Sequence, residues 1–137
     1  MPDFITWLND YSVGHTTIDQ QHQRIIAIIN TLYTYFRENI DSHRDDIPPL
    51  LNELAEYAKS HFSFEEDVLQ NVGFPGLEDH RKLHVRFVEK TASLNDLAFH
   101  GFEGVPHDMF AFLKKWWLHH IRMEDMKYRP LLQMPAG

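Results

Sequence analysis

Cysteine is absent from all 137 residues, and so is any apolar run of about 18 residues, the length needed to cross a membrane. Without cysteine the chain has no disulfides, no thiolate catalysis and no cysteine-bound iron–sulfur cluster. The absence of cysteine does not indicate in which cellular compartment the protein works. The first ten residues, MPDFITWLND, lack the basic start and apolar core of a secretory signal. We therefore expect a cytoplasmic protein that is not membrane-embedded.

Basic residues are also scarce, with 13 lysines and arginines against 20 acidic residues and a net charge of −7. Nucleic acids and anionic membranes bind basic faces, so this charge argues against either partner. With 43% hydrophobic and 24% charged residues, the composition is typical of a globular domain. The length suits one domain with a real core, so we expect a single domain over residues 1–137.

Apolar residues recur at three- and four-residue spacing in four segments, which predicts an all-α fold. We expect helices near residues 18–37, 46–73, 77–101 and 104–129. Asp46 is a candidate N-cap, and Gly73 is a candidate left-handed terminator. Four such helices with short links predict an up-down-up-down antiparallel four-helix bundle over residues 18–130. Residues 1–17 lack a helical period, and we expect them to form an N-terminal arm packed on the bundle.

Ten histidines stand out, and five of them interrupt the apolar stripes of the predicted helices: His22, His61, His80, His84 and His120. One such histidine alone would usually be a hydrogen-bonded core residue. Five on four helices cannot satisfy one another with protons, because each neutral ring has one donor and one acceptor. A metal ion would accept their lone pairs. The other five histidines are assigned no role: His15, His43, His100, His107 and His119.

Carboxylates extend this candidate metal site. Glu65 follows His61 by four residues and therefore faces the same side of a helix, where an unpaired buried carboxylate would be costly. His80 and His84 repeat that spacing.

The fourth helix leaves its ligands open, since His119 or His120 could supply nitrogen, and Glu124 or Asp125 could supply oxygen. Spacing alone prefers His120 with Glu124, because a five-residue step turns about 140° around an α-helix.

The number of candidate ligands exceeds the needs of one ion, since zinc takes about four. Five imidazoles and two carboxylates instead fit two six-coordinate ions bridged by the carboxylates and by a solvent-derived group. Imidazole combined with carboxylate suits iron, among other metals. A bundle that buries these histidines without metal is the structural alternative.

Four motifs together resemble the hemerythrin family, specifically the single-domain bacteriohemerythrins: HTTIDQQHQRI, HFSFEED, DHRKLH and HHIRMEDMKY, in this order. The resemblance implies that one iron is held by His80, His84 and His120, and the other by His22 and His61. It implies that Glu65 and Asp125 bridge the two irons together with an oxo or hydroxo group. The choice of His120 with Asp125 is thus made by analogy.

The resemblance further implies reversible dioxygen binding, as a hydroperoxide on the five-coordinate iron, in a carrier, store or delivery protein and not in an enzyme. An oxygen or redox sensor, or a protein that handles nitric oxide or peroxide, could use the same site. No signalling domain accompanies it, which favours a carrier or store. A membrane enzyme that uses oxygen would be a fitting recipient, and we expect a monomer. A ferritin-like di-iron enzyme would need Glu-x-x-His motifs, which this sequence lacks.

Trp117, beside Trp116, departs from the resemblance, which implies an aliphatic residue lining the oxygen pocket at this position. Either Trp117 fills the core, or it narrows the pocket or changes access to it. Both interpretations stay open at the level of the sequence.

Overall fold

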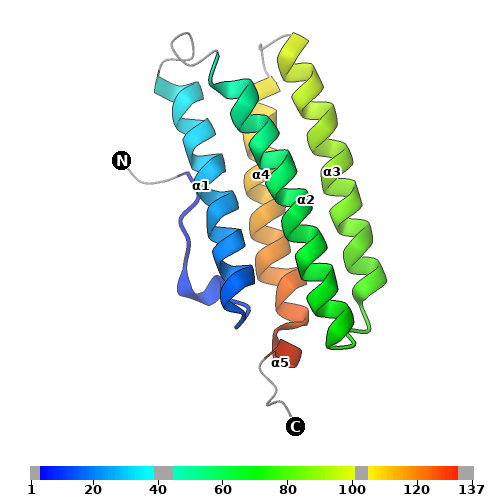
Figure 1. Ribbon diagram of the computed structural model, residues 1–137. Coiled ribbons are helices and arrows are strands. Elements are labelled where there is room, and N and C mark those ends of the chain that lie inside the picture. The colour runs from blue at the N-terminus through cyan, green and yellow to red at the C-terminus, as the bar shows by residue number, and fades with distance from the viewer. Residues whose placement is uncertain (1–3, 39–44, 101–104, 133–137) are drawn as a thin grey trace.

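Four long helices form the molecule, which a computed structural model describes over residues 4–38, 45–100 and 105–132. They are α1 (Thr16–Glu38), α2 (Ile47–Asn71), α3 (Leu77–His100) and α4 (Val105–His119). They run side by side, and α1 and α3 each pack against both α2 and α4 (Figure 1). No strand occurs in the described residues. The predicted all-α antiparallel four-helix bundle is therefore confirmed.

Of the two signals that the sequence predicted for the ends of α2, one is present in the structure and the other is not. Gly73 has a positive φ of 69°, so the predicted left-handed terminator is present just after the helix. Asp46 occupies the N-cap position, but its backbone is α-helical and its side chain makes no capping hydrogen bond. The predicted side-chain cap is therefore wrong, because a capping carboxylate needs an extended backbone to reach back to the free N–H groups.

The fourth helix differs most from expectation, since a continuous α-helix was predicted almost to Pro130. The α-helical pattern stops at His119 and continues as a π-helical turn, η3 (His120–Glu124), and a 3-10 turn, η4 (Asp125–Lys127). A short helix, α5 (Arg129–Leu132), follows and contains Pro130 near its start. The backbone N–H of Asp125 donates to the carbonyl of His120, which is the five-residue bond of a π turn.

The described residues before α1, residues 4–15, pack on the bundle as predicted, and they include a 3-10 turn, η1 (Asn9–Tyr11). Ile5 and Tyr11 are buried in the main apolar cluster. The side chain of Asn30 holds the arm from α1: it accepts from the N–H of Ile5 at 2.8 Å and donates to the carbonyl of Ile5 at 2.9 Å. Leu8, in contrast, is 49% exposed, so not every apolar side chain of the arm is covered.

Two apolar clusters lie along the bundle axis with a polar layer between them. The larger cluster includes Ile25, Phe62 and Trp117, and the smaller one includes Ile18 and Leu69. No helix in the described residues combines the length and the hydropathy needed to cross a bilayer. The buried polar layer between the clusters is where the predicted site residues lie.

Candidate metal centre

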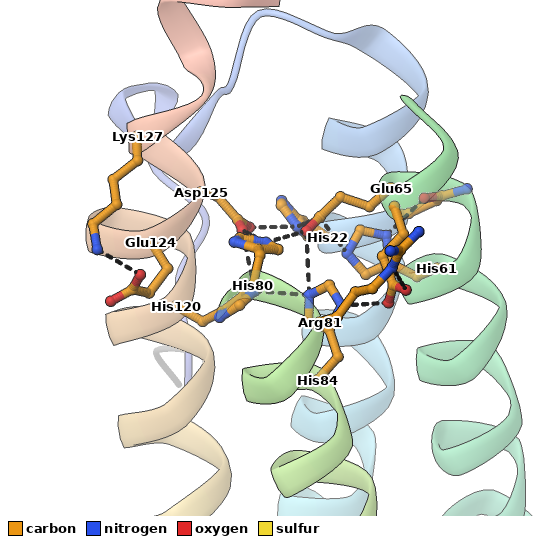
Figure 2. A network of polar contacts seen from close by, with 12 residues as sticks. His22, His61, Glu65, His80, Arg81, His84, His120, Glu124, Asp125 and Lys127 are labelled. Atoms are coloured by element: carbon orange, nitrogen blue, oxygen red, sulfur yellow. Dashed lines mark hydrogen bonds and ion pairs between the residues drawn. The ribbon is translucent and has the colours of Figure 1, made fainter. Parts of the chain in front are cut away.

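The bundle gathers all seven predicted site residues in one buried layer, where each is at most 3% exposed. They come from α1, α2, α3 and the two turns that continue α4: His22 of α1, His61 and Glu65 of α2, His80 and His84 of α3, His120 of η3 and Asp125 of η4. Figure 2 shows these side chains pointing toward one another between the helices. The apolar periodicity of the sequence thus indicated the five buried histidines and Glu65, whereas spacing alone did not select Asp125.

Helical spacing positions the residues contributed by α2 and α3. His61 and Glu65 are one turn apart, and their Nε2 and Oε2 atoms lie 3.1 Å apart. His80 and His84 are also one turn apart, with ring centroids separated by 4.7 Å. Each helix therefore presents a pair of donor groups to the same space.

The π turn explains how His120 and Asp125 both reach the centre. In an α-helix a five-residue step would separate them by about 140°. The wider turn of η3 brings them over one another instead, with His120 Nε2 3.1 Å from Asp125 Oδ1. Glu124, which α-helical spacing preferred, pairs with Lys127 at 2.8 Å on the outer side, away from the cluster (Figure 2).

Both buried carboxylates divide their two oxygens between two groups of histidines. Glu65 places Oε1 2.6 Å from His80 Nε2 and Oε2 3.1 Å from His61 Nε2. Asp125 places Oδ1 3.0 Å from His80 Nε2 and Oδ2 3.1 Å from His22 Nε2. This is the arrangement that bridging two cations requires: one oxygen of each carboxylate faces each half of the layer.

All five imidazoles direct Nε2 toward the carboxylates. Two of them are also held at the outer nitrogen, His61 Nδ1 by Gln21 Oε1 at 2.7 Å and His84 Nδ1 by Glu66 Oε2 at 2.8 Å. Sequence reasoning missed Gln21 and Glu66. They flank the apolar stripes, and the only signal was their adjacency to His22 and Glu65.

The buried histidines and carboxylates of the layer strongly change one another's pKa values. Burial alone would lower the pKa of His22 and His80, but Asp125 and Glu65 outweigh it and raise these pKa values to about 9 and about 10. Burial would raise the pKa of Glu65, yet the surrounding histidines hold it well below its usual range. The pKa of Asp125 is likewise lowered by His120 and His22, against burial and the nearby Glu65. Without metal, protonated histidines would balance the two carboxylates.

Protons do not satisfy the layer, however. Several buried atoms lack a hydrogen-bond partner although a nitrogen or oxygen atom of another side chain lies about 3 Å away: Nε2 of His22 and His61, Oε2 of Glu65 and both oxygens of Asp125. His84 and His120 also place their Nε2 atoms 3.2 Å from each other. Ring nitrogens and carboxylate oxygens thus converge on shared space without forming a complete set of hydrogen bonds. Cations in that space would displace the ring protons and bind the freed lone pairs.

The donor atoms fall into two sets, each compact enough for one metal ion. One set is His22, His61 and Glu65, which we call the two-histidine half. The other is Glu65, His80, His84 and His120, which we call the three-histidine half. Glu65 belongs to both. The residues present therefore fit a pair of ions better than a single one.

The two predicted pocket tryptophans are neighbours, with ring centroids 4.9 Å apart, but the histidine closest to each is different. Trp117 is fully buried, with ring centroids 6.1 Å from His61 and 6.4 Å from His22, beside the two-histidine half. Trp116 stacks on His120 at 4.4 Å, beside the three-histidine half.

Two of the histidines without an assigned role are described. His119 has a 63% exposed side chain, and His15 accepts from the backbone N–H of Ile18 with Nδ1. His43 and the side chains of His100 and His107 lie outside the described residues.

Comparison with known proteins places these features in context. The family model described as the hemerythrin HHE cation binding domain matches residues 13–132. A bacteriohemerythrin of Stenotrophomonas maltophilia is 31% identical over 90% of this chain and 78% of its own length. A hemerythrin-like protein of Naegleria gruberi is 29% identical over 96% of this chain and 97% of its own. A crystal structure of wild-type hemerythrin superposes with a TM-score of 0.80 at 29% identity, covering 95% of this chain and 98% of that one.

Proposed function

Because this chain belongs to the hemerythrin family, we propose that it binds dioxygen reversibly at a non-haem di-iron centre, as a carrier, store or delivery protein. The observation that carries this proposal is the division of the Glu65 and Asp125 oxygens between two groups of inward-facing imidazoles. Two ions held side by side would use the inward-facing nitrogens and oxygens of the layer, including Nε2 of His22 and His61, which lack a hydrogen bond.

The two halves would bind their ions unequally. In the three-histidine half, one ion would be held by three imidazoles and by one oxygen from each carboxylate. The other half offers the same two carboxylates but only two imidazoles, those of His22 and His61, so its ion would have one protein ligand fewer and could accept an added ligand. A pair of ferrous ions would supply the electrons that reversible dioxygen binding needs. We propose that dioxygen enters at the two-histidine half.

The chain itself would keep water and protons away from the ion of the two-histidine half. Trp117 and Ile25 are fully buried, and Phe62 and Phe87 are at most 4% exposed. An apolar wall of this kind raises the cost of charge separation and limits protonation of bound ligands, which favours release of dioxygen unchanged. The nitrogen-rich donor set also supports binding over oxidative catalysis, so we propose that the protein is not an enzyme.

Other expectations remain predictions of the sequence. These are a single domain over residues 1–137, a monomeric state, a cytoplasmic location and a membrane oxygen-using enzyme as recipient.

An absorption spectrum combined with iron analysis tests the proposal. Protein loaded with ferrous iron under anaerobic conditions should contain about two irons per chain, the stoichiometry of di-iron bundles. Exposure to air should produce a visible absorption band that disappears again when oxygen is removed. Protein that retains no iron, or a spectrum that changes in air and never reverts, would contradict the proposed function.

A further inference from the structure

The outer nitrogens of two candidate ligands meet chemically different partners. The Nδ1–H of His84 donates to a carboxylate oxygen of Glu66 at 2.8 Å, in the three-histidine half. The Nδ1–H of His61 donates to the neutral amide oxygen of Gln21 at 2.7 Å, in the two-histidine half. Both bonds fix the tautomer that leaves Nε2 free to face the centre.

Glu66 is itself held in place. Its other oxygen, Oε1, accepts from Arg81 Nε at 3.2 Å, so the carboxylate is fixed between Arg81 and His84. The ring of Phe62 stacks on the ring of His84 with centroids 3.9 Å apart and planes 9° from parallel. Stacking fixes the plane of the imidazole, and Glu66 fixes its rotation within that plane.

The position of Glu66 also places it at the boundary with solvent. A groove of about 320 Å³ between α2 and α3 reaches His84 and is lined by Glu66, Val85 and Glu89, among other residues. The side chain of Glu66 is 23% exposed there, whereas that of His84 is 2% exposed. Glu66 therefore covers the outer edge of a ligand that otherwise lies directly beneath an open groove.

The charge of the partner matters for the ligand. A carboxylate that accepts the Nδ1 proton draws it outward, which makes the opposite nitrogen a stronger donor to a metal. A charge-assisted bond is also roughly twice as strong as a neutral one. The amide of Gln21 gives His61 an orienting bond without this increase in basicity.

We propose that Glu66 is a positioning residue that acts through His84, and that it makes the three-histidine half the slower of the two to release its metal. This inference rests on the proposed di-iron centre, since it compares the two halves of that centre. It assigns to the Glu66–Arg81 pair a task beyond an ordinary surface ion pair, which would contribute little.

Release of iron to a chromogenic ferrous chelator tests the inference without measuring oxygen binding. Wild-type protein loaded anaerobically should release iron in two phases, and His61→Ala should remove the fast one. Glu66→Ala should accelerate the slow phase about 10-fold or more, as expected for an outer partner of a ligating histidine. Glu66→Gln, which keeps an acceptor but loses the charge, should lie between wild type and Glu66→Ala.

Glu89→Ala is the matched control, because it removes an exposed carboxylate from the same groove and should leave both phases unchanged. The metal-free forms of wild type and Glu66→Ala should melt together, which separates positioning from a general loss of stability. The inference is overturned by release in a single phase, by an unchanged slow phase in Glu66→Ala, or by a Gln variant no slower than the Ala variant. Wild-type protein that holds no iron would instead overturn the proposed function.

Discussion

At the residue scale, each histidine of the polar layer has one nitrogen facing the carboxylates, and His61 shows what this requires. Gln21 holds its outer nitrogen at 2.7 Å, while Nε2 lies 3.1 Å from Glu65 without a hydrogen bond between them. A buried nitrogen without a partner costs free energy, so the position favours histidine only when something binds there.

His61→Ala should remove one of the two imidazoles that would hold the open-site iron. We expect iron content to fall from about two per chain to about one or less, and reversible oxygen binding to be lost. Iron analysis and the spectral change in air measure both effects. His119→Ala is the control, since that side chain is 63% exposed and should change neither. Equal iron content in the two variants would contradict the assignment of His61.

Trp117 lies where a pocket for dioxygen would be, against both His22 and His61. Replacing it by the smaller leucine should open space beside the two-histidine half and increase the rates of oxygen association and dissociation severalfold. Stopped-flow measurements of both rates test this. Trp116→Leu should have a smaller effect, because the histidine on which Trp116 stacks is His120, a residue of the three-histidine half. Rates unchanged by Trp117→Leu would mean that the side chain only fills the core.

At the element scale, the π turn is the feature that periodicity could not predict. Counting residues at a constant 3.6 per turn located four helices and five inward-facing histidines correctly, because most of the bundle follows that repeat. The same count predicted that Glu124 lies on the same helix face as His120 and that Asp125 points away from that face. Only the resemblance to a family favoured Asp125. The local change of pitch depends on tertiary packing, so nothing in the spacing of the fourth helix announces it.

The π turn predicts opposite outcomes for two adjacent carboxylates. Asp125→Ala removes the group whose oxygens lie 3.0 to 3.1 Å from His80, His22 and His120, and it should weaken iron retention at least about 10-fold. Glu124→Ala removes only a partly exposed partner of Lys127 and should retain wild-type iron content. Iron analysis after gel filtration compares them. A regular α-helix in solution would reverse the two results.

At the scale of the whole molecule, polar side chains fill one complete layer of the bundle core. The two apolar clusters stabilise the fold on either side of that layer. The sequence predicted this arrangement well, because buried stripes interrupted by histidines are visible in the periodicity. It did not predict Gln21 or Glu66, since residues beside a stripe look like ordinary surface positions until the neighbouring helix is known. That the five histidines, Glu65 and Asp125 bind metal stays a prediction.

Stability should therefore depend on metal. The seven donor groups converge only in the folded bundle, so any ion they bind stabilises the native state over the unfolded chain. At free iron about 100 times above the dissociation constant, the gain would be about 2.7 kcal/mol. For a chain of this size we expect the Tm to rise by on the order of 10 °C. Anaerobic calorimetry with ferrous iron and with excess chelator measures the difference.

The matched pair of carboxylate variants makes this measurement specific to the polar layer. Glu124→Ala should keep the full iron-dependent rise in Tm, because its side chain lies outside the layer. Asp125→Ala should lose most of it, since one oxygen donor to each half is gone. If iron changed the Tm of none of the three proteins (wild type, Glu124→Ala and Asp125→Ala), the layer would be a buried network that binds protons alone. Its unpaired nitrogens and oxygens would then have to be satisfied by rearrangement of the bundle core.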